Sequence, residues 1–300
     1  MNWTAANIPS QDGKIAIVTG ANSGLGEETA RVLAQKGAYV VMAVRSIAKG
    51  QAAKARIVAQ QPNAKLELMQ LDLSDLDSVK AFAAAYQSAH HKLDILVNNA
   101  GVMQTATREL TKQGFEMQFG VNHLAHFALT AALLPVLKAT PNARVVSLSS
   151  IYHKIGAAIH FDDLMWARRY DKAKAYAQSK LANLLFAYEL DRKLKANGLE
   201  IISTAAHPGY TKTNLQRHLG FTGLIGNALV AQSIEMGTLP SLRAATEPGL
   251  VGGEFFGPTK LGELRGYPEK VASSSMSNDK QLAEKLWQVS EELTGTSFAF

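Results

Sequence analysis

From Lys14 onward, short apolar runs rich in β-branched residues alternate with longer segments of helical periodicity. This alternation is typical of βαβ units, because two parallel strands need a crossover between them, and it predicts a parallel sheet. Most of the runs are apolar without a break, as expected when helices cover both faces. The expected strands are 15–19, 39–44, 65–70, 93–97, 144–148 and 200–205, with a weaker one near 253–256.

Helical patterns fill the intervals between these runs, at 26–36, 48–60, 76–88, 122–138 and 173–196. Ser74, followed by Asp75 and Asp77, is typical of a helix N-terminus with an oxygen cap, and Asn197-Gly198 is typical of a helix end. The chain shows no repeat, low-complexity block or flexible linker. We therefore expect one domain over residues 1–300, a doubly wound α/β fold with a mostly parallel, seven-stranded sheet and helices on both faces.

The composition excludes several kinds of site. The chain is 47% hydrophobic and 19% charged, which predicts a large core rather than disorder. It contains no cysteine, which excludes disulfides, thiolate metal sites and cysteine nucleophiles, and its histidines form no ligand cluster, so no metal is expected. The net charge is +6, but the lysines and arginines are scattered along the sequence, so we expect no nucleic-acid partner.

The location of the protein is predicted from two further features. Residues 1–14 lack the basic start and apolar run of a secretory signal. The longest apolar stretches, such as 127–137, are shorter than the roughly 18 residues of a membrane span, so no transmembrane segment is expected. The absence of cysteine fits a reducing compartment. We expect a cytoplasmic protein.

A glycine-rich loop follows the first expected strand and leads directly into a helix. Its glycines allow a tight turn and a close approach to a pyrophosphate, while the helix N-terminus presents free N–H groups. The spacing differs from the common GxGxxG pattern, so the position between strand and helix carries the prediction. We expect a Rossmann-type dinucleotide site. Its predicted phosphate-binding residues are Gly20, Asn22, Ser23, Gly24, Leu25 and Gly26.

The end of the second expected strand indicates which dinucleotide binds. NAD enzymes usually carry a carboxylate there for the ribose 2′-hydroxyl, whereas this chain carries Arg45, which can donate paired hydrogen bonds to a 2′-phosphate. The alternative is that Arg45 and its neighbour Lys49 are ordinary surface residues. We expect NADP(H) as the preferred cofactor and NAD(H) as the alternative.

Tyr176 and Lys180 stand four residues apart on an expected helix and so share one face. An ammonium beside a tyrosine favours the phenolate and brings its pKa, ordinarily about 10, closer to working pH. Such a tyrosine can act as a general acid and base. Ser149 and Ser150 close the fifth expected strand, where a hydroxyl can hydrogen-bond a substrate oxygen. Each feature alone is ordinary, but their order along the chain predicts an active site.

With these residues the chain resembles the short-chain dehydrogenase/reductase family over nearly its whole length. The motifs that carry the resemblance are 19–26, Asp72, 98–101, Asn122, Ser149-Ser150, Tyr176-xxx-Lys180 and Pro208-Gly209. The resemblance implies that Tyr176 exchanges a proton with the substrate oxygen. Ser150, in preference to Ser149, would orient that oxygen. Lys180 would bind the nicotinamide ribose and lower the pKa of Tyr176, and Asn122 would hold a water that links Lys180 to solvent.

The resemblance also implies cofactor contacts outside the glycine-rich loop. Asp72, with Leu73 beside it, would contact the adenine, and the segment 98–101, with Asn98, Ala100 and Gly101, would line the adenine ribose. Pro208 and Gly209 would also contact the cofactor, and Thr211 and Thr213 would fix the carboxamide. The hydride would pass directly between nicotinamide and carbon.

Further stretches are similar to the branch that holds retinol dehydrogenases, WW-domain oxidoreductases and protochlorophyllide reductases. They are 21–26, Val44-Arg45, 160–164 in a long serine-to-tyrosine interval, and 179–183. This implies an NADP(H)-dependent oxidoreductase that acts on a hydrophobic substrate. It would interconvert the carbonyl group of an aldehyde or ketone and the corresponding alcohol. Two alternatives are a protochlorophyllide reductase-like C=C reductase, ranked lower because its pigment-side cysteines are missing here, and a non-catalytic protein that senses NADP(H).

Two segments without clear periodicity, 151–171 and 207–226, follow the fifth and sixth expected strands, where ligands bind in such sheets. We expect 207–226 to form a substrate loop or lid. The glycines of 220–226 would permit closure, and the equal alternative is a buried helix start. Residues 271–300 form a C-terminal extension. Family members often pair through the helices that carry Asn122 and Tyr176, so we expect a homodimer or homotetramer unless the extension blocks an interface.

Overall fold

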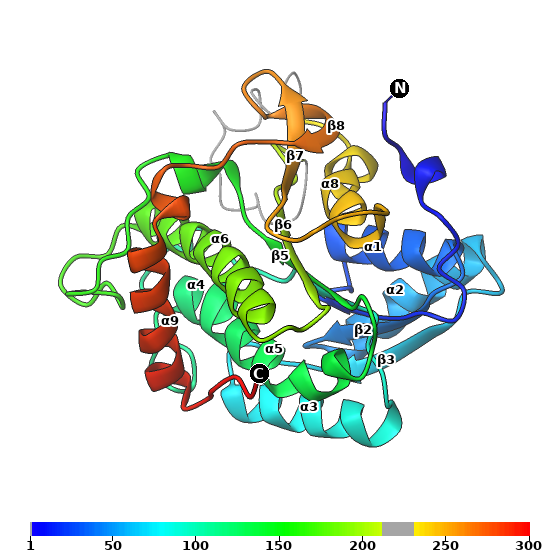
Figure 1. The fold of residues 1–300 in the computed structure, drawn as a ribbon, viewed down its shortest axis with the longest axis horizontal. Helices are drawn as coiled ribbons and strands as arrows, with labels where there is room; N and C mark the ends of the chain where they lie inside the picture. Colours follow the sequence, from blue (N-terminus) through cyan, green and yellow to red (C-terminus); the bar gives the residue numbers. More distant parts are fainter. Residues whose placement is uncertain (1, 212–230) are drawn as a thin grey trace.

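The structure is a computed structural model that describes residues 2–211 and 231–300. One sheet runs through its middle (Figure 1). Its strands, in spatial order, are β3 (Leu66–Gln70), β2 (Tyr39–Val44), β1 (Ile15–Thr19), β4 (Ile95–Asn98), β5 (Arg144–Leu148), β6 (Ile202–Ala206), β7 (Phe255–Lys260) and β8 (Arg265–Lys270). Neighbouring strands are parallel except β7 and β8. The predicted doubly wound α/β fold is confirmed, with an eighth strand that the sequence did not predict.

Successive side chains of each strand point to opposite faces, and each face carries its own helices. One layer contains α3 (Leu76–Ala89), α5 (Ala125–Lys138) and α6 (Lys172–Ala196), with α9 (Lys280–Thr294) outside them; the other contains α1 (Gly24–Gln35), α2 (Ile47–Gln60) and α8 (Ile234–Thr246). Ile17 of β1 packs into the first layer, and Ala16 and Val18 pack into the second. This double burial explains the unbroken apolar strands.

The chain reverses its direction of travel across the sheet between β1 and β4. From β1 it runs outward through β2 and β3, then crosses back to β4 and continues toward the other edge. The loops after β1 and β4 therefore part at the carboxyl ends of two neighbouring strands. Ligands of open α/β sheets bind in the crevice that forms at such a point.

Among the described residues, most predicted element bounds agree with the structure within two residues, but one strand and two long helices were missed. β8 lies at the sheet edge, is largely charged and contains Pro268, and an edge strand needs no apolar alternation. α8 contains Gly237 and Pro240, which weaken its helical pattern. The third missed element, α9, lies in the segment described only as an extension. The predicted cap of α3 was also wrong by one residue, because Asp75 caps the helix.

The predicted helix 122–138 begins earlier than expected. Met117–Phe119 (α4) and the π-helical turn Gly120–Leu124 (η2) precede α5 without a break. Within the described residues, Met117–Lys138 is the one helix long and apolar enough to cross a membrane, with a mean hydropathy of 1.4. This corrects the expectation that no apolar stretch reaches that length. In this structure 89% of the apolar window is buried in the protein, as in the core helix of a soluble fold.

Aromatic side chains fix α9 to the outside of the first layer. The ring of Trp287 lies 5.0 Å from that of Phe127 on α5 and 5.9 Å from that of Phe186 on α6, measured between centroids. Phe298, in the tail after α9, closes the cluster at 4.5 Å from Trp287. Aromatic rings supply much of the apolar area of a core. The C-terminal extension is therefore part of the hydrophobic core.

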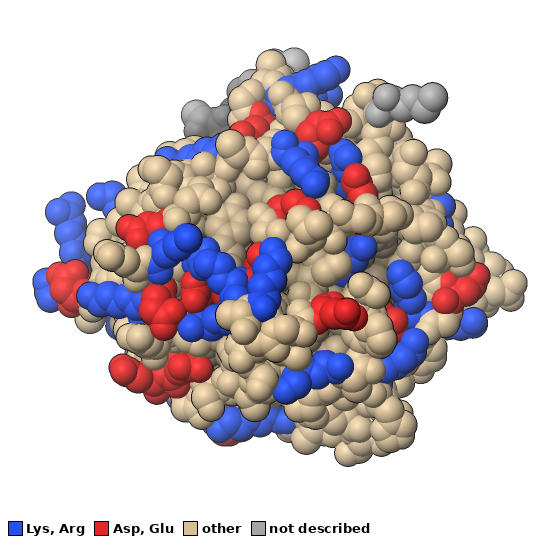
Figure 2. Space-filling model, viewed as in Figure 1, with Lys and Arg blue, Asp and Glu red and all other residues tan. Residues whose placement is uncertain are grey.

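Charged side chains of both signs cover the outer surface of α6 and α9. Lys193 of α6 lies 3.0 Å from Glu284 of α9, and Arg192 pairs with Glu189. Figure 2 shows such basic and acidic residues side by side on this face. These four charges neutralise one another in pairs, so they form no basic surface for an anionic polymer.

We expect Trp287→Ala to lower the free energy of unfolding by about 3–5 kcal/mol, because it removes a large buried side chain and leaves a cavity. Urea unfolding followed by circular dichroism measures this. The exposed Gln281 of the same helix is the matched control, and Gln281→Ala should change the stability by less than about 0.5 kcal/mol. An equal effect of both substitutions would contradict the packing role of Trp287.

Candidate active site

The glycine-rich loop joins β1 to α1 in a geometry that only glycines permit. Gly20 and Gly24 have φ angles of +69° and +57°. A Cβ on Gly26 would lie 2.5 Å from both the Gly20 carbonyl oxygen and the Asn99 side-chain nitrogen. Within the described residues, the Ser23 side chain makes no cap hydrogen bond to α1, so first-turn N–H groups stay open to a ligand. This cradle, with a helix N-terminus at its end, fits a dinucleotide pyrophosphate.

Arg45 lies at the position where the sequence predicts that the protein distinguishes the 2′-phosphate of NADP(H) from the 2′-hydroxyl of NAD(H). It follows β2 directly, beside the loop that follows β1, and its side chain is exposed. Its carbonyl oxygen accepts a hydrogen bond from the Gln70 side chain at 3.4 Å. Within the part of the chain that the structure describes, its guanidinium has no hydrogen-bond or ion-pair partner. The guanidinium can therefore turn toward an anion at the carboxyl end of β2.

The residues predicted around the adenine differ in exposure. Asp72 is half-buried, and its carboxylate accepts hydrogen bonds from the backbone N–H and the hydroxyl of Ser74, at 2.9 and 2.6 Å. Leu73 is buried in the core of the first layer. Asn98 is also buried, and its side-chain amide donates to the Thr130 hydroxyl at 3.0 Å. Only the backbone of Leu73 and Asn98 is left to line the crevice.

Asn99, to which the sequence assigned no separate role, ties the loop after β4 to the loop after β1. Its side chain donates to the Thr19 carbonyl oxygen at 2.7 Å. The Thr19 hydroxyl in turn accepts from the backbone N–H groups of Asn99 and Ala100, both at 2.9 Å. The two loops that border the crevice are thus fixed to each other.

The structure brings the four predicted catalytic residues together at the carboxyl ends of β4 and β5. The Asn122 Oδ1 and Lys180 Nζ atoms both lie beside Gly101, at 3.1 and 3.6 Å from the place that a Gly101 Cβ would take. Lys180 Nζ lies 5.7 Å from the centre of the Tyr176 ring. Ser150 hydrogen-bonds the Tyr176 side chain. The residues come from three separate elements, which only the fold assembles.

The two serines after β5 have different surroundings. Ser149 is buried, and its hydroxyl donates to the Lys180 carbonyl oxygen at 2.7 Å. Ser150 is partly exposed beside Tyr176, and its hydroxyl accepts the N–H of Tyr152 at 3.3 Å. A hydroxyl has one hydrogen to donate, and Ser149 uses its own within the protein. The geometry therefore agrees with the preference for Ser150.

Asn122 owes its position to the π-helical turn. Its side-chain oxygen accepts from the Val102 N–H at 2.8 Å, and its nitrogen donates to the Val102 carbonyl oxygen at 3.0 Å and to the Ser179 hydroxyl at 2.9 Å. No residue pattern in the sequence indicates this turn, although π-helical turns are frequent at functional sites. The side chain is held from two sides and does not move freely.

Burial sets the charges of Tyr176 and Lys180. Loss of water raises the pKa of the Tyr176 phenol to about 12, against a smaller lowering by the hydrogen bond from Ser150. Burial also lowers the pKa of the Lys180 ammonium to about 8. The expectation that Lys180 brings the pKa of Tyr176 down toward neutrality is therefore not met, because the cost of burying the phenolate dominates and Lys180 is not among the groups that shift this pKa.

Two buried histidines contact the C-terminal extension. His153 donates from Nδ1 to the Ser150 carbonyl oxygen at 2.6 Å, and its Nε2 accepts the N–H of Ser274 at 3.3 Å. This links the C-terminal extension to the predicted catalytic serine. His123 contacts the hydroxyl of Ser290 on α9, with 2.9 Å between Nε2 and Oγ. Among the described residues, no group of histidines and carboxylates could hold a metal.

The nicotinamide side of the crevice is described only in part. After β6, Gly209 has a φ of +62°, and its Cα lies so close to the β7–β8 hairpin that a Cβ would be 2.5 Å from the Leu264 carbonyl oxygen. The Thr211 hydroxyl donates to the Pro208 carbonyl oxygen at 2.7 Å. Thr213 and the lid segment 220–226 lie outside the described residues, so these two predictions stand as predictions.

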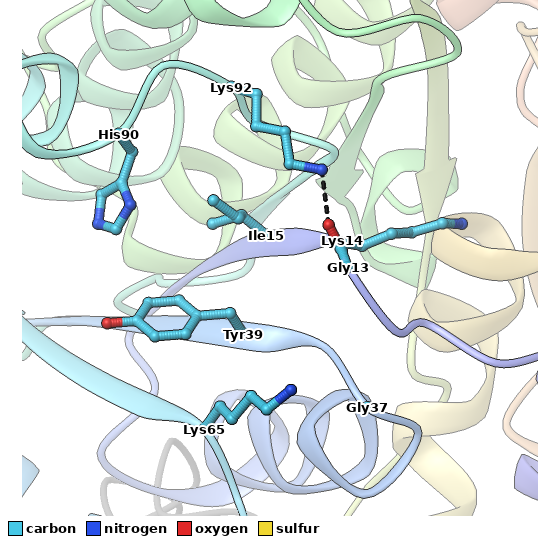
Figure 3. A pocket seen from close by; sticks show the side chains of 8 residues that line it. All are labelled: Gly13, Lys14, Ile15, Gly37, Tyr39, Lys65, His90 and Lys92. Atoms are coloured by element: carbon cyan, nitrogen blue, oxygen red, sulfur yellow. Dashed lines mark hydrogen bonds between the residues drawn. The ribbon is translucent and has the colours of Figure 1, made fainter.

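A hollow of 390 Å³ lies at the opposite edge of the sheet, near the amino ends of β1 and β2 (Figure 3). Two of its four basic lining side chains are paired: Lys92 donates to the Gly13 carbonyl oxygen at 2.6 Å and lies 3.2 Å from Asp94, and His90 contacts Glu67 at 2.9 Å. The hollow has no contact with the predicted catalytic residues. We assign it no part in the chemistry.

Lys180 gives the folding stability a pH dependence of definite sign. Its pKa falls from the ordinary 10.5 to about 8 on folding, so the folded protein binds this proton more weakly. Its contribution to stability is present above pH 10.5 and is lost as the pH falls through 8. Between pH 10 and 8, the unfolding free energy should drop by up to roughly 3 kcal/mol on its account. Urea unfolding of Lys180→Met should lack this drop, and the exposed Lys174→Met should keep it; equal slopes would contradict it.

Comparison with known proteins agrees with this geometry. The family model for short chain dehydrogenases matches residues 14–221. Retinol dehydrogenase 12 of Mus musculus is 42% identical over 296 residues, which cover 97% of this chain and 89% of the relative. Retinol dehydrogenase 13 of Homo sapiens is 40% identical over 301 residues, which cover 97% and 86%.

Solved structures agree as well. A putative uncharacterized protein from Mycobacterium paratuberculosis superposes with a TM-score of 0.84 and 42% identity over 100% of both chains. The RhlG/NADP complex of Pseudomonas aeruginosa shares the fold, with a TM-score of 0.67 and 24% identity over 82% of this chain and 94% of that one. The chain belongs to the short-chain dehydrogenase/reductase family, in its retinol dehydrogenase-like branch, and is an oxidoreductase that acts on CH–OH and C=O groups.

Proposed function

We propose that this protein interconverts a hydrophobic aldehyde or ketone and the corresponding alcohol with NADP(H), and that Tyr176 is its acid and base. The observation that carries the proposal is the buried phenol of Tyr176, hydrogen-bonded to Ser150 and 5.7 Å, at its ring centre, from Lys180 Nζ. This group lies at the carboxyl edge of the sheet, on the same side as the glycine-rich cradle. Proton and hydride can therefore reach one C–O bond.

The residues divide the chemistry between them. Bound NADP(H) supplies or accepts the hydride at the substrate carbon. With its pKa near 12, Tyr176 is protonated at neutral pH, which is the form that donates a proton to a carbonyl oxygen. The Ser150 hydroxyl, which contacts the Tyr176 phenol, can turn its hydrogen to the same substrate oxygen when the substrate binds. Lys180 places positive charge beside the phenolate that forms, and Asn122, next to Gly101 and Lys180, holds the water through which the proton is replaced.

Support for a hydrophobic substrate comes from the loops beyond Ser150. The ion pair between Lys154 and Glu263, at 2.7 Å, joins the loop after β5 to the β7–β8 hairpin. Each loop exposes a large apolar residue next to this pair: Ile155 is 56% exposed and Leu261 is 62% exposed. Apolar side chains on two neighbouring loops near the site suit an apolar ligand. The names of the relatives point to retinol, so retinal is the first aldehyde to test.

The preference for NADP(H) rests on the exposed, unpaired Arg45 at the end of β2. A guanidinium there gains charge-assisted hydrogen bonds from a 2′-phosphate and loses nothing from its own structure. We keep the cytoplasmic location as a prediction from the sequence, together with a homodimer or homotetramer as the assembly.

Tyr176→Phe should bind NADPH like the parent but reduce aldehydes about 100- to 10,000-fold more slowly, since it lacks the acid. Turnover is followed by NADPH absorbance with retinal and a series of long aldehydes, ketones and alcohols. Tyr188→Phe is the matched control, because it removes a phenol hydroxyl from the same helix, where the hydroxyl contacts Ser273. A Tyr176→Phe enzyme that is as fast as the parent would refute the role of the phenol.

Arg45→Asp should weaken NADPH binding about 10- to 100-fold and leave NADH binding nearly unchanged, because it replaces a charge-assisted partner of the 2′-phosphate with a like charge. Dissociation constants from nicotinamide fluorescence test this. Lys65→Asp makes the same change of charge at an exposed lysine next to the amino end of β3, and it should affect neither cofactor. Equal losses for NADPH and NADH in Arg45→Asp would exclude the 2′-phosphate contact.

A further inference from the structure

His126 lies on α5 between the two halves of the crevice. It is buried, with 3% of its surface exposed. Its Nδ1 lies 3.0 Å from the backbone carbonyl oxygen of Asn122, and its Nε2 lies 3.0 Å from the Thr19 hydroxyl. One ring thus contacts both the π-helical turn of the predicted proton relay and the last residue of β1 before the phosphate cradle.

The hydrogen-bond partners determine which nitrogen of His126 carries the proton. A carbonyl oxygen only accepts, so Nδ1 must be the donor toward Asn122. The Thr19 oxygen already accepts the N–H groups of Asn99 and Ala100, which occupy both of its lone pairs. The Thr19 hydroxyl can donate its one hydrogen to the Val97 carbonyl oxygen at 3.4 Å or to Nε2 at 3.0 Å, and the shorter contact assigns it to Nε2. The ring is neutral, since burial lowers the pKa of His126 to about 4.

This direction of bonds excludes a proton pathway through the ring. Neither a carbonyl oxygen nor the amide N–H groups behind Thr19 can pass a proton on at neutral pH. The network instead runs in a fixed sense, from the Asn99 and Ala100 amides through Thr19 and His126 to Asn122. Buried polar networks in which every member is satisfied are rigid and specify one arrangement.

We propose that His126 is a positioning residue that fixes the Asn122–Lys180 geometry to the loops of the dinucleotide cradle. The proposal deepens the proposed function and rests on it where turnover is measured. Its two bonds have separate effects. The bond to Asn122 holds the turn whose side chain lies beside Gly101 and Lys180. The bond to Thr19 holds the residue that joins the loops after β1 and β4, and therefore the place where the dinucleotide binds.

Two substitutions separate these bonds. In His126→Asn, the side-chain amide can place its N–H near the position of Nδ1 and keep the bond to Asn122, but it does not reach Thr19. In His126→Gln, the longer side chain can place an oxygen near the position of Nε2 and accept from Thr19, but the donor to Asn122 is lost. His126→Phe loses both. His123→Phe is the matched control, because it removes a neighbouring buried histidine whose Nε2 contacts Ser290 instead.

Each variant is measured for its dissociation constant with NADPH and for kcat at saturating NADPH with the aldehyde that the parent reduces best. We expect His126→Gln to lose about tenfold or more in kcat and to bind NADPH within about threefold of the parent, since a small displacement of a catalytic group is costly. For His126→Asn we expect the opposite, about tenfold weaker NADPH binding and kcat within about threefold. His126→Phe should lose both, and His123→Phe should lose only thermal stability.

Loss of both quantities in the same proportion in His126→Asn and His126→Gln, or loss in neither, would overturn the proposal. Nitrogen-15 NMR of the imidazole gives an independent result: a ring protonated on Nδ1 supports the proposal, and one protonated on Nε2 overturns it. If the parent binds NADPH but reduces no carbonyl compound, the proposed function fails. The positioning role is then decided by whether the two variants differ in NADPH binding and by the protonated nitrogen.

Discussion

The hydroxyl of Thr19 holds together the two loops on which the active site depends. It accepts backbone N–H groups from Asn99 and Ala100, across from one strand to its neighbour, at the point where the chain changes direction in the sheet. The crevice of a doubly wound sheet exists because these loops part. Their separation has to be constant, however, if a long dinucleotide is to reach from the cradle to Tyr176. The Thr19 hydroxyl keeps this distance constant, because its side chain is short and buried and all of its hydrogen-bonding capacity is occupied.

In the catalytic half of the site, burial disfavours the charged forms of the two groups that carry the chemistry. Tyr176 and Lys180 are both buried, and water loss moves their pKa values in opposite directions, toward the neutral form of each. A protein built for stability alone would fill such positions with apolar side chains. Here the ammonium keeps one bond, to the Leu148 carbonyl oxygen at 3.1 Å, and the phenol keeps one, with Ser150. Both groups are therefore held in place but have capacity for a further partner.

Much of this arrangement could be read from the sequence, because the fold depends on local patterns. The strands are apolar runs bounded by polar residues, and the glycine-rich loop, Ser150, Tyr176 and Lys180 stand at positions that the fold brings together. The contacts of His126 and His153 could not be read, since their partners are backbone atoms or a distant threonine and leave no spacing in the sequence. The strand β8 and the inward side chain of Asn98 were missed for a related reason: an edge position and a core position look alike when only residue types are visible.

The aromatic cluster of Trp287, Phe127, Phe186 and Phe298 has a consequence for how the protein is made. α9 leaves the ribosome well after α5 and α6, and until it does, Phe127 of α5 and Phe186 of α6 lack the surface that covers them. The nucleotide-binding half, formed by β1 to β4 with its helices, is complete much earlier in synthesis. Proteins generally begin to fold during synthesis, so α5 and α6 would keep an apolar face open to solvent until α9 has been made. Synthesis of the extension and maturation of the active site are in this way one event.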